Sequence, residues 1–310
     1  MSKYFDHARQ TNGNSTQDAI ANRADVQQVL EVTAQSYGQP KETSEGLLSR
    51  CRSVQLPITS DNPVIFARND FAAIALESYR ALRARLLRLQ AAQRFRSVVL
   101  TSAAAADGKT LTTINLALCC AQVQDFRVLV IDSDLRTCGL TRLFGQAETP
   151  GLGNILDGSA KYEDAILRTQ NPNLFLVGGG IPSHLAPELF SGKRWKEFMA
   201  WCTGQFSLIL VDSPPVLAVA DFEQIINACD GVLVVVRALQ TQRDMLRKAA
   251  LRIDPKKLLG IVYNGAQVSA QSEYMAGTTA VPQFTSSNVS PSSRESDAAQ
   301  TVPDTVQAGR

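Results

Sequence analysis

The sequence contains very little histidine, and this scarcity limits the chemistry that the chain can perform. Only two histidines occur among the 310 residues, His7 and His184. A histidine-rich metal site is therefore nearly excluded, and catalysis by a Ser-His-Asp triad or a Cys-His pair is disfavoured. Any chemistry should depend on lysine, aspartate, threonine and a bound metal ion.

Long apolar runs, strong net charge and closely paired cysteines are also absent. No run approaches the roughly 18 apolar residues of a membrane span, and the first residues lack the apolar centre of a signal peptide. The net charge of +2 gives no strong field that would attract nucleic acid or acidic lipid. None of the six cysteines forms a C-x-x-C pair, so we expect reduced thiols. These absences predict a cytoplasmic protein with no nucleic-acid partner and no direct membrane span.

Composition divides the chain into three segments. Residues 1–65 are polar, rich in Gln, Asn, Ser and Thr, and predict a flexible N-terminal arm with a short helix around Asp25–Thr33. Residues 267–310 are rich in Ser, Thr, Ala and Pro and predict a disordered tail. Residues 66–266, between them, alternate strand and helix signals and are predicted to form the folded domain.

The middle segment has the pattern of an α/β fold. Its predicted strands are Ser97–Thr101, Val128–Ile131, Leu174–Val177, Leu208–Val211, Gly231–Val236 and Leu258–Tyr263. Several are continuously apolar, as in strands covered by helices on both faces. Helical patterns occupy Phe71–Arg96, Thr110–Gln122, Ala186–Thr203, Asp221–Ala228 and Thr241–Ile253. This order predicts a doubly wound, mainly parallel sheet that binds its ligand at the carboxyl ends of the strands.

The loop after the first of these strands has the pattern of a phosphate-binding loop. Residues 103–110 read Ala-Ala-Ala-Ala-Asp-Gly-Lys-Thr. In such a loop, backbone N–H groups surround the phosphates, Lys109 adds a positive charge, and the Thr110 hydroxyl reaches a magnesium ion. The residues predicted to contact the nucleotide are Ala103, Ala104, Ala105, Ala106, Asp107, Gly108, Lys109, Thr110 and Leu111.

The loop departs from the strict pattern, because Ala103 stands where glycine is usual. Left-handed backbone positions in a loop of this kind cost a residue other than glycine roughly 1–2 kcal/mol each. Only Gly108 can adopt such a conformation without strain.

Carboxylates follow two other predicted strands. Asp132 and Asp134 come at the end of one, and Asp212 ends another before two prolines. Each aspartate alone could simply cap a turn. Together with Thr110 and two phosphate oxygens, they offer the oxygen ligands that Mg²⁺ prefers. The sequence therefore predicts a P-loop NTPase type of fold with a metal site beside the loop.

A wider set of motifs resembles a known family. The motifs are Gly108-Lys109-Thr110 with Asn115-Leu-Ala117, Asp132-x-Asp134-x-Arg136, Gly151-Leu-Gly-Asn-Ile-Leu-Asp-Gly158, Pro187-Glu-Leu-Phe190, Asp212-Ser-Pro-Pro-Val216 with Asp221, and Leu259-Gly-Ile-Val-Tyr-Asn264. They resemble the bacterial tyrosine kinases of capsule and exopolysaccharide biosynthesis, in their stand-alone cytoplasmic form. The resemblance implies ATP- and Mg²⁺-dependent phosphorylation of protein tyrosines, including autophosphorylation.

The resemblance also implies individual roles. Lys109 would neutralise the β- and γ-phosphates, and Thr110 would bind Mg²⁺. Asp132 would activate the tyrosine hydroxyl or poise a metal-bound water, while Asp134 and Asp212 would organise the metal ion. Phosphoryl transfer is mostly positioning and charge neutralisation, so this small set can suffice. Asn264, after the last strand, is either an adenine contact or a simple turn residue.

The helix predicted over Phe71–Arg96 has a basic surface. From the residues alone, it is a packed helix with a solvated basic face, because no aromatic residues accompany the arginines as nucleic-acid binding would require. The resemblance instead implies that Glu77, Arg80 and Arg83 contact a neighbouring subunit near its nucleotide site. Such a head-to-tail contact can close into a ring. We therefore expect a nucleotide-dependent homo-oligomer.

The chain differs from the family pattern in its tail and in its loop. The tail has one tyrosine, Tyr274, where family kinases carry a cluster, and Ala105 and Ala106 replace a common Pro-Gly pair. Tyr274 is the candidate phospho-acceptor; Tyr4, Tyr37 or another protein are the alternatives.

Two other functions stay open at this point. One is a nucleotide-binding regulatory subunit of the polysaccharide machinery with little kinase activity. The other is a partitioning or positioning ATPase, which is disfavoured because Ala104 stands where that branch has an extra lysine. The resemblance implies two partners, the cytoplasmic segment of a membrane polysaccharide co-polymerase that sets chain length, and a tyrosine phosphatase. The first would recruit the kinase to the inner face of the plasma membrane.

Overall fold

Eight strands form a single sheet in the computed structural model, which describes residues 45–56, 64, 73–146, 150–180 and 184–266. The strands are β1 (Arg52–Ser53), β2 (Ser97–Ser102), β3 (Val128–Asp132), β4 (Ile166–Arg168), β5 (Leu174–Val177), β6 (Leu208–Asp212), β7 (Gly231–Arg237) and β8 (Leu258–Asn264). Their order across the sheet is β1-β4-β5-β3-β6-β2-β7-β8. Neighbouring strands run parallel except β4 and β5, which are antiparallel.

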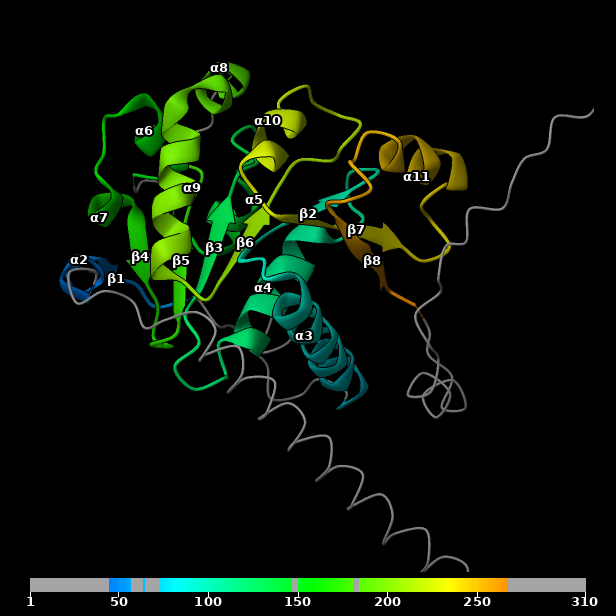
Figure 1. Cartoon of the computed structure of the whole chain (residues 1–310), viewed down its shortest axis with the longest axis horizontal. Helices are drawn as coiled ribbons and strands as arrows, with labels where there is room; N and C mark the ends of the chain where they lie inside the picture. The colour runs from blue at the N-terminus through cyan, green and yellow to red at the C-terminus, as the bar shows by residue number, and fades with distance from the viewer. Residues whose placement is uncertain (1–44, 57–63, 65–72, 147–149, 181–183, 267–310) are drawn as a thin grey trace, which may run out of the picture. The chain divides into compact units, whose positions relative to one another are not determined.

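Helices connect the strands and surround the sheet (Figure 1). They are α2 (Glu45–Arg50), α3 (Ala73–Gln93), α4 (Lys109–Cys120), α5 (Gly139–Leu143), α6 (Leu152–Asp157), α7 (Tyr162–Ala165), α8 (Ala186–Ser191), α9 (Lys193–Gln205), α10 (Phe222–Asn227) and α11 (Arg243–Ala250). None of the helices in the described ranges is both long and apolar enough to cross a bilayer.

The sheet is buried on both faces, which explains why its central strands are continuously apolar. Along β2, Val99 packs into one core cluster while Val98 and Leu100 pack into the other. Side chains of α8, α9 and α10 complete the first cluster, and side chains of α3 and α4 complete the second. Figure 1 shows α3 lying alongside α4, and the two helices are in contact. Alternate residues of a strand point to opposite faces, so both sets must be apolar here.

The predicted doubly wound, mainly parallel fold is therefore confirmed. All six predicted strands are present; β5 has the predicted bounds, and the other five, β2, β3, β6, β7 and β8, are each one residue longer than predicted. The helix predicted over Ala186–Thr203 is instead two helices, because Gly192 has an extended backbone that ends α8 and precedes α9. Strands β1 and β4 escaped prediction because they have only two and three residues.

The prediction that residues 1–65 form a flexible arm is wrong for its last part. Helix α2 and strand β1 lie within that range, and β1 pairs with β4 in the sheet. Leu48 and Cys51 are buried, and they belong to the core cluster that side chains of α8, α9 and α10 complete. The helix predicted around Asp25–Thr33, the tail from residue 267 and Tyr274 lie outside the described residues. The described residues all belong to one unit that ends at Ala266.

Candidate nucleotide-binding and catalytic site

The site residues lie at the carboxyl ends of three adjacent strands. β3, β6 and β2 are neighbours in the sheet, and all three run parallel. Asp132 at the end of β3 is directly opposite Asp212 at the end of β6. The phosphate-binding loop follows β2, so the fold brings the loop and both carboxylates to one edge, as the sequence predicts.

The phosphate-binding loop uses two left-handed backbone positions. Gly108 has a φ of 91°, as expected for the one glycine of the loop. Ala106 also has a positive φ, 65°, although it carries a Cβ. A left-handed conformation costs alanine roughly 1–2 kcal/mol, so the loop holds strain that a glycine at this position would remove.

Asp107 connects the loop to the rest of the domain. This residue is only 4% exposed, and its Oδ2 accepts a hydrogen bond from the Ala104 N–H at 3.1 Å. Asn264 Nδ2 donates to the Asp107 carbonyl at 2.9 Å. The positive φ of Gly108 favours glycine, and a Cβ added there would also displace the Asn264 amide. The end of β8 therefore contacts the phosphate-binding loop directly.

Thr110 and Asp212 are in direct contact. The Thr110 hydroxyl donates to Asp212 Oδ2 at 2.7 Å, and Thr113 donates to Oδ1 at 3.5 Å. Burial raises the pKa of Asp212 to about 7, and the negative charges of Asp132 and Asp134 act in the same direction. The Lys109 ammonium opposes this effect, which places the lysine within electrostatic reach of the carboxylate.

Asp132 is held through one of its two oxygens. Its Oδ2 accepts hydrogen bonds from the Thr141 N–H at 2.9 Å and from the Thr141 hydroxyl at 2.8 Å. Its Oδ1 is buried and accepts no hydrogen bond from the residues that the structure describes. Burial is the main cause that raises the pKa of Asp132 to about 6. A buried carboxylate oxygen without a partner is costly, so its presence points to a ligand, a metal ion or a reacting hydroxyl at this position.

The oxygen donors at this edge suit a magnesium ion bound with its phosphates. Within the described ranges, no three His, Cys, Asp or Glu side chains are grouped as a ready metal cage. Mg²⁺ commonly binds through one or two carboxylates or hydroxyls, several waters and substrate phosphates, so it needs no such cage. Thr110, Asp212 and the unpartnered oxygen of Asp132 fit that kind of site.

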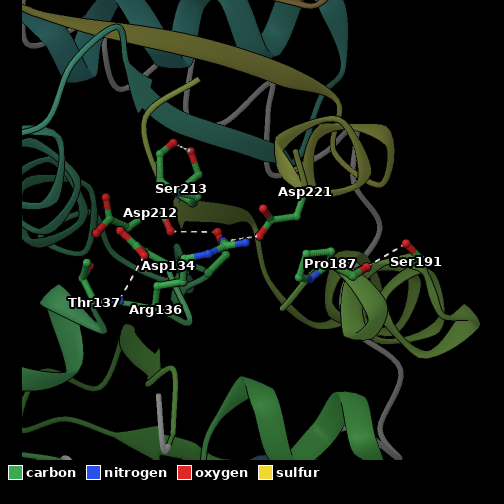
Figure 2. Close-up of polar contacts among 10 residues, drawn as sticks. Asp134, Arg136, Thr137, Pro187, Ser191, Asp212, Ser213 and Asp221 are labelled. Atoms are coloured by element: carbon green, nitrogen blue, oxygen red, sulfur yellow. Dashed lines mark hydrogen bonds and ion pairs between the residues drawn. The ribbon is translucent and has the colours of Figure 1, made fainter. Parts of the chain in front are cut away.

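The segment after β3 is fixed by two polar contacts (Figure 2). Asp134 Oδ1 accepts a hydrogen bond from the Thr137 N–H at 3.2 Å. Arg136 forms an ion pair with Asp221 at 2.7 Å, and Asp221 is fully buried. This ion pair joins the β3 segment to the start of α10, so it fixes the backbone that carries Asp134.

The predicted self-association residues lie on α3. Glu77 and Arg80 are exposed and form an ion pair with each other. Arg83 is half-buried, and it donates a hydrogen bond to the Cys119 carbonyl of α4 at 2.8 Å. Glu77 and Arg80 are therefore accessible for a neighbouring chain, whereas Arg83 also supports the packing of α3 on α4.

Thr141 and Thr241 are site residues that the sequence did not reveal. Thr141 lies in the short helix α5 and holds Asp132. The hydroxyl of Thr241, before α11, donates a hydrogen bond of 2.7 Å to Asp107, although the two residues are 134 positions apart in the sequence. Neither threonine belongs to a recognisable motif, and no local sequence pattern predicts which aspartate each one contacts. Asp221 did appear among the motifs, but its partnership with Arg136 depends on the fold.

The fold and the site define a P-loop nucleotide-binding protein. Consistent with this, residues 98–248 match the family described as an AAA domain. The chain is 34% identical over 213 residues to the tyrosine-protein kinase YwqD of Bacillus subtilis, which covers 68% of this chain and 89% of that protein. The chain therefore belongs to the bacterial tyrosine-protein kinases and is a protein-tyrosine kinase.

Other relatives agree with this assignment. The tyrosine-protein kinase CpsD of Streptococcus agalactiae is 32% identical over 170 residues, 54% of this chain and 73% of that protein. The BceF tyrosine kinase domain has a similar structure, with a TM-score of 0.58 and 28% identity over 73% of this chain and 87% of that one. The kinase domain of the Escherichia coli tyrosine kinase ETK shares the fold, with a TM-score of 0.62 and 24% identity over 76% of this chain and 96% of that one.

Proposed function

We propose that this kinase transfers a phosphoryl group from Mg²⁺-ATP to protein tyrosines in a system that makes and exports capsule or exopolysaccharide. The observation that carries the proposal is the unpartnered Oδ1 of Asp132, buried beside Asp212 at the edge that holds the phosphate-binding loop. A tyrosine hydroxyl placed at this oxygen would meet a carboxylate with a raised pKa, suited to accept its proton.

The other residues would bind and orient the nucleotide. Lys109 begins α4 and would place its ammonium against the β- and γ-phosphates, where the N–H groups of the helix N-terminus also point. Thr110 and Asp212 would hold Mg²⁺, with Asp134 organising its water ligands. The bound ion would neutralise charge on the transferring phosphoryl group. Asn264 would border the adenine side of the loop.

The proposal includes a partner and an assembly. The cytoplasmic segment of a polysaccharide co-polymerase would activate the kinase and bring it to the membrane, and a tyrosine phosphatase would reverse the reaction. Glu77, Arg80 and Arg83 would contact the nucleotide site of the next subunit in a homo-oligomer. The exposed pair Glu77–Arg80 supports this, because it can exchange its internal contact for one with a neighbouring chain.

Incubation with Mg²⁺-ATP and the partner segment, followed by phosphotyrosine mass spectrometry, tests the proposal. We expect phosphotyrosine in the wild type, its loss in Lys109→Met and Asp132→Asn, and its retention in Lys193→Met, a control at an exposed lysine that pairs with Glu197. Tyr274→Phe identifies whether the tail tyrosine is the acceptor. If the wild type binds ATP but forms no phosphotyrosine on itself or on the partner, the chain is a regulatory nucleotide-binding subunit instead.

A further inference from the structure

The phosphate-binding loop contains three residues that are unusual for its shape. Ala104, Ala105 and Ala106 are consecutive alanines; the last two stand where a Pro-Gly pair is common, and Ala106 is strained at a φ of 65°. A loop of alanines does not prefer this conformation by itself. Contacts from outside the loop must therefore stabilise it.

Asp107 receives those contacts. Its side chain is almost fully buried, and within the part of the chain that the structure describes no basic side chain pairs with it. Oδ2 accepts the Ala104 N–H from within the loop, and Oδ1 accepts the Thr241 hydroxyl at 2.7 Å. A buried carboxylate without a cation depends on such hydrogen bonds, so the loss of either one is costly.

Thr241 is itself fixed by the turn that follows β7. Its Oγ1 accepts a hydrogen bond from the Arg237 N–H at 2.9 Å, and its own N–H donates to the Arg237 carbonyl at 3.0 Å. The hydroxyl has one hydrogen, and the bond from Arg237 orients the oxygen so that this hydrogen points to Asp107. The turn is anchored in the sheet, because β7 pairs with both β2 and β8.

We infer that Thr241 is a positioning residue for the nucleotide site, which acts through Asp107 to hold the alanine-rich phosphate-binding loop in its nucleotide-binding shape. Thr241 need not contact the nucleotide. Its hydroxyl fixes the Asp107 carboxylate, the carboxylate fixes Ala104, and Gly108 and Lys109 follow directly in the chain. The inference depends on nucleotide binding at this loop and not on the identity of the protein that is phosphorylated.

The test measures the binding of a fluorescent ADP to the full chain in EDTA, so that neither metal nor catalysis contributes. Thr241→Val removes the hydroxyl and preserves the shape, and we expect the Kd to rise about tenfold, as for the loss of one hydrogen bond to a charged group. Thr241→Ser restores the hydroxyl and should return the Kd to within about twofold of the wild type. In kinase assays the KM for ATP should rise with the Kd, while kcat changes less.

Thr169→Val is the matched control. Thr169 Oγ1 also bridges a turn, donating to the Asn171 carbonyl at 3.0 Å and accepting from the Asn171 N–H at 3.1 Å, but this turn follows β4. We expect this variant to lose thermal stability and to bind ADP as the wild type does. A purely structural role for Thr241 would give the same result as this control.

A second combination tests the route through Asp107. In an Asp107→Ala background, Thr241→Val should add less than a further twofold to the Kd, because the hydroxyl no longer has its acceptor. Wild-type affinity in Thr241→Val, or failure of Thr241→Ser to restore it, overturns the inference. A wild type that binds ADP without phosphorylating tyrosine would contradict the proposed kinase function alone, whereas a wild type that binds no ADP either in EDTA or with Mg²⁺ contradicts both.

Discussion

The phosphate-binding loop has backbone strain at a single residue. Its sequence, with several alanines and one glycine, suggested such strain but did not show which alanine would have it. Ala106 has the left-handed backbone, while neighbouring Ala105 does not. The two alanines are both exposed, so they differ mainly in backbone conformation. Substitution by glycine should therefore have opposite effects at these two adjacent positions.

We predict that Ala106→Gly raises the free energy of unfolding by about 0.5–1 kcal/mol, because glycine adopts a positive φ without strain. Ala105→Gly should lower it by a similar amount, since it only adds freedom to the unfolded chain. Urea unfolding of both variants measures the difference. A loss of stability in both would mean that the strain at Ala106 is absent in solution.

The buried carboxylate of Asp212 leads to a prediction about pH. Its pKa rises from 3.8 to about 7 on folding, so the folded state holds a proton that the unfolded state releases. The stability associated with this group is complete below about pH 4 and is lost as the pH rises toward 7. The nucleotide-free protein should accordingly be less stable at pH 8 than near pH 4 as far as Asp212 is concerned, because at pH 8 its buried carboxyl group is ionised.

Asp212→Asn should abolish this loss. In EDTA, we expect the variant to be more stable than the wild type at pH 8 by roughly 1–3 kcal/mol, and equal to it near pH 4. Thermal unfolding at a series of pH values provides the measurement. The same variant should lose binding of Mg²⁺-nucleotide. A constant difference between the two proteins at all pH values would contradict the assignment of the titration to Asp212.

At the scale of elements, a buried ion pair connects the segment after β3 to α10. Arg136 is one-third exposed, but its partner Asp221 is completely buried, and one Asp221 oxygen accepts no hydrogen bond within the described part of the chain. Removing the arginine would leave an uncompensated buried charge. The pair therefore matters for stability in a way that the exposed pairs of this protein do not.

We predict that Arg136→Ala lowers the free energy of unfolding by about 2–4 kcal/mol. Adding Asp221→Asn should recover part of the loss, because it removes the unpaired charge. Glu197→Gln, which breaks the exposed pair with Lys193, should change stability by no more than about 0.5 kcal/mol. Denaturant unfolding of the three variants compares them. Equal effects of Arg136→Ala and Glu197→Gln would show that Asp221 finds another partner.

At the scale of the whole molecule, the proposed homo-oligomer depends on the surface of α3. Glu77 and Arg80 are exposed on α3, while Arg83 also contacts α4. Changing all three together would mix a loss of assembly with a loss of packing. A cleaner variant leaves Arg83 in place and changes only the exposed pair.

We expect Glu77→Ala/Arg80→Ala to shift the protein from oligomer to monomer when nucleotide is present, as measured by sedimentation velocity. Arg88→Ala, at another exposed arginine of α3, is the control and should assemble normally. The reason is geometric, since a head-to-tail contact needs one particular patch and not basic charge in general. An unchanged sedimentation coefficient in the double variant would remove α3 from the interface.

The sequence by itself determined the six longer strands of the sheet, the phosphate-binding loop and the aspartates at the strand ends. These features follow from local order, because a continuous apolar run predicts a buried strand and a Gly-Lys-Thr between strand and helix predicts a phosphate site. Parallel strands align their carboxyl ends, so Asp132 and Asp212 were expected at one edge, and the structure places them opposite each other.

Only the tertiary structure decided which side chains hold these residues in place. Thr141 with Asp132, Arg136 with Asp221 and Thr241 with Asp107 join segments that no periodicity relates. The flexible-arm boundary failed for the same reason, since the short elements α2 and β1 gain their stability from the core and from β4. Local patterns encode local structure, whereas the partners of a buried polar group depend on how distant segments pack.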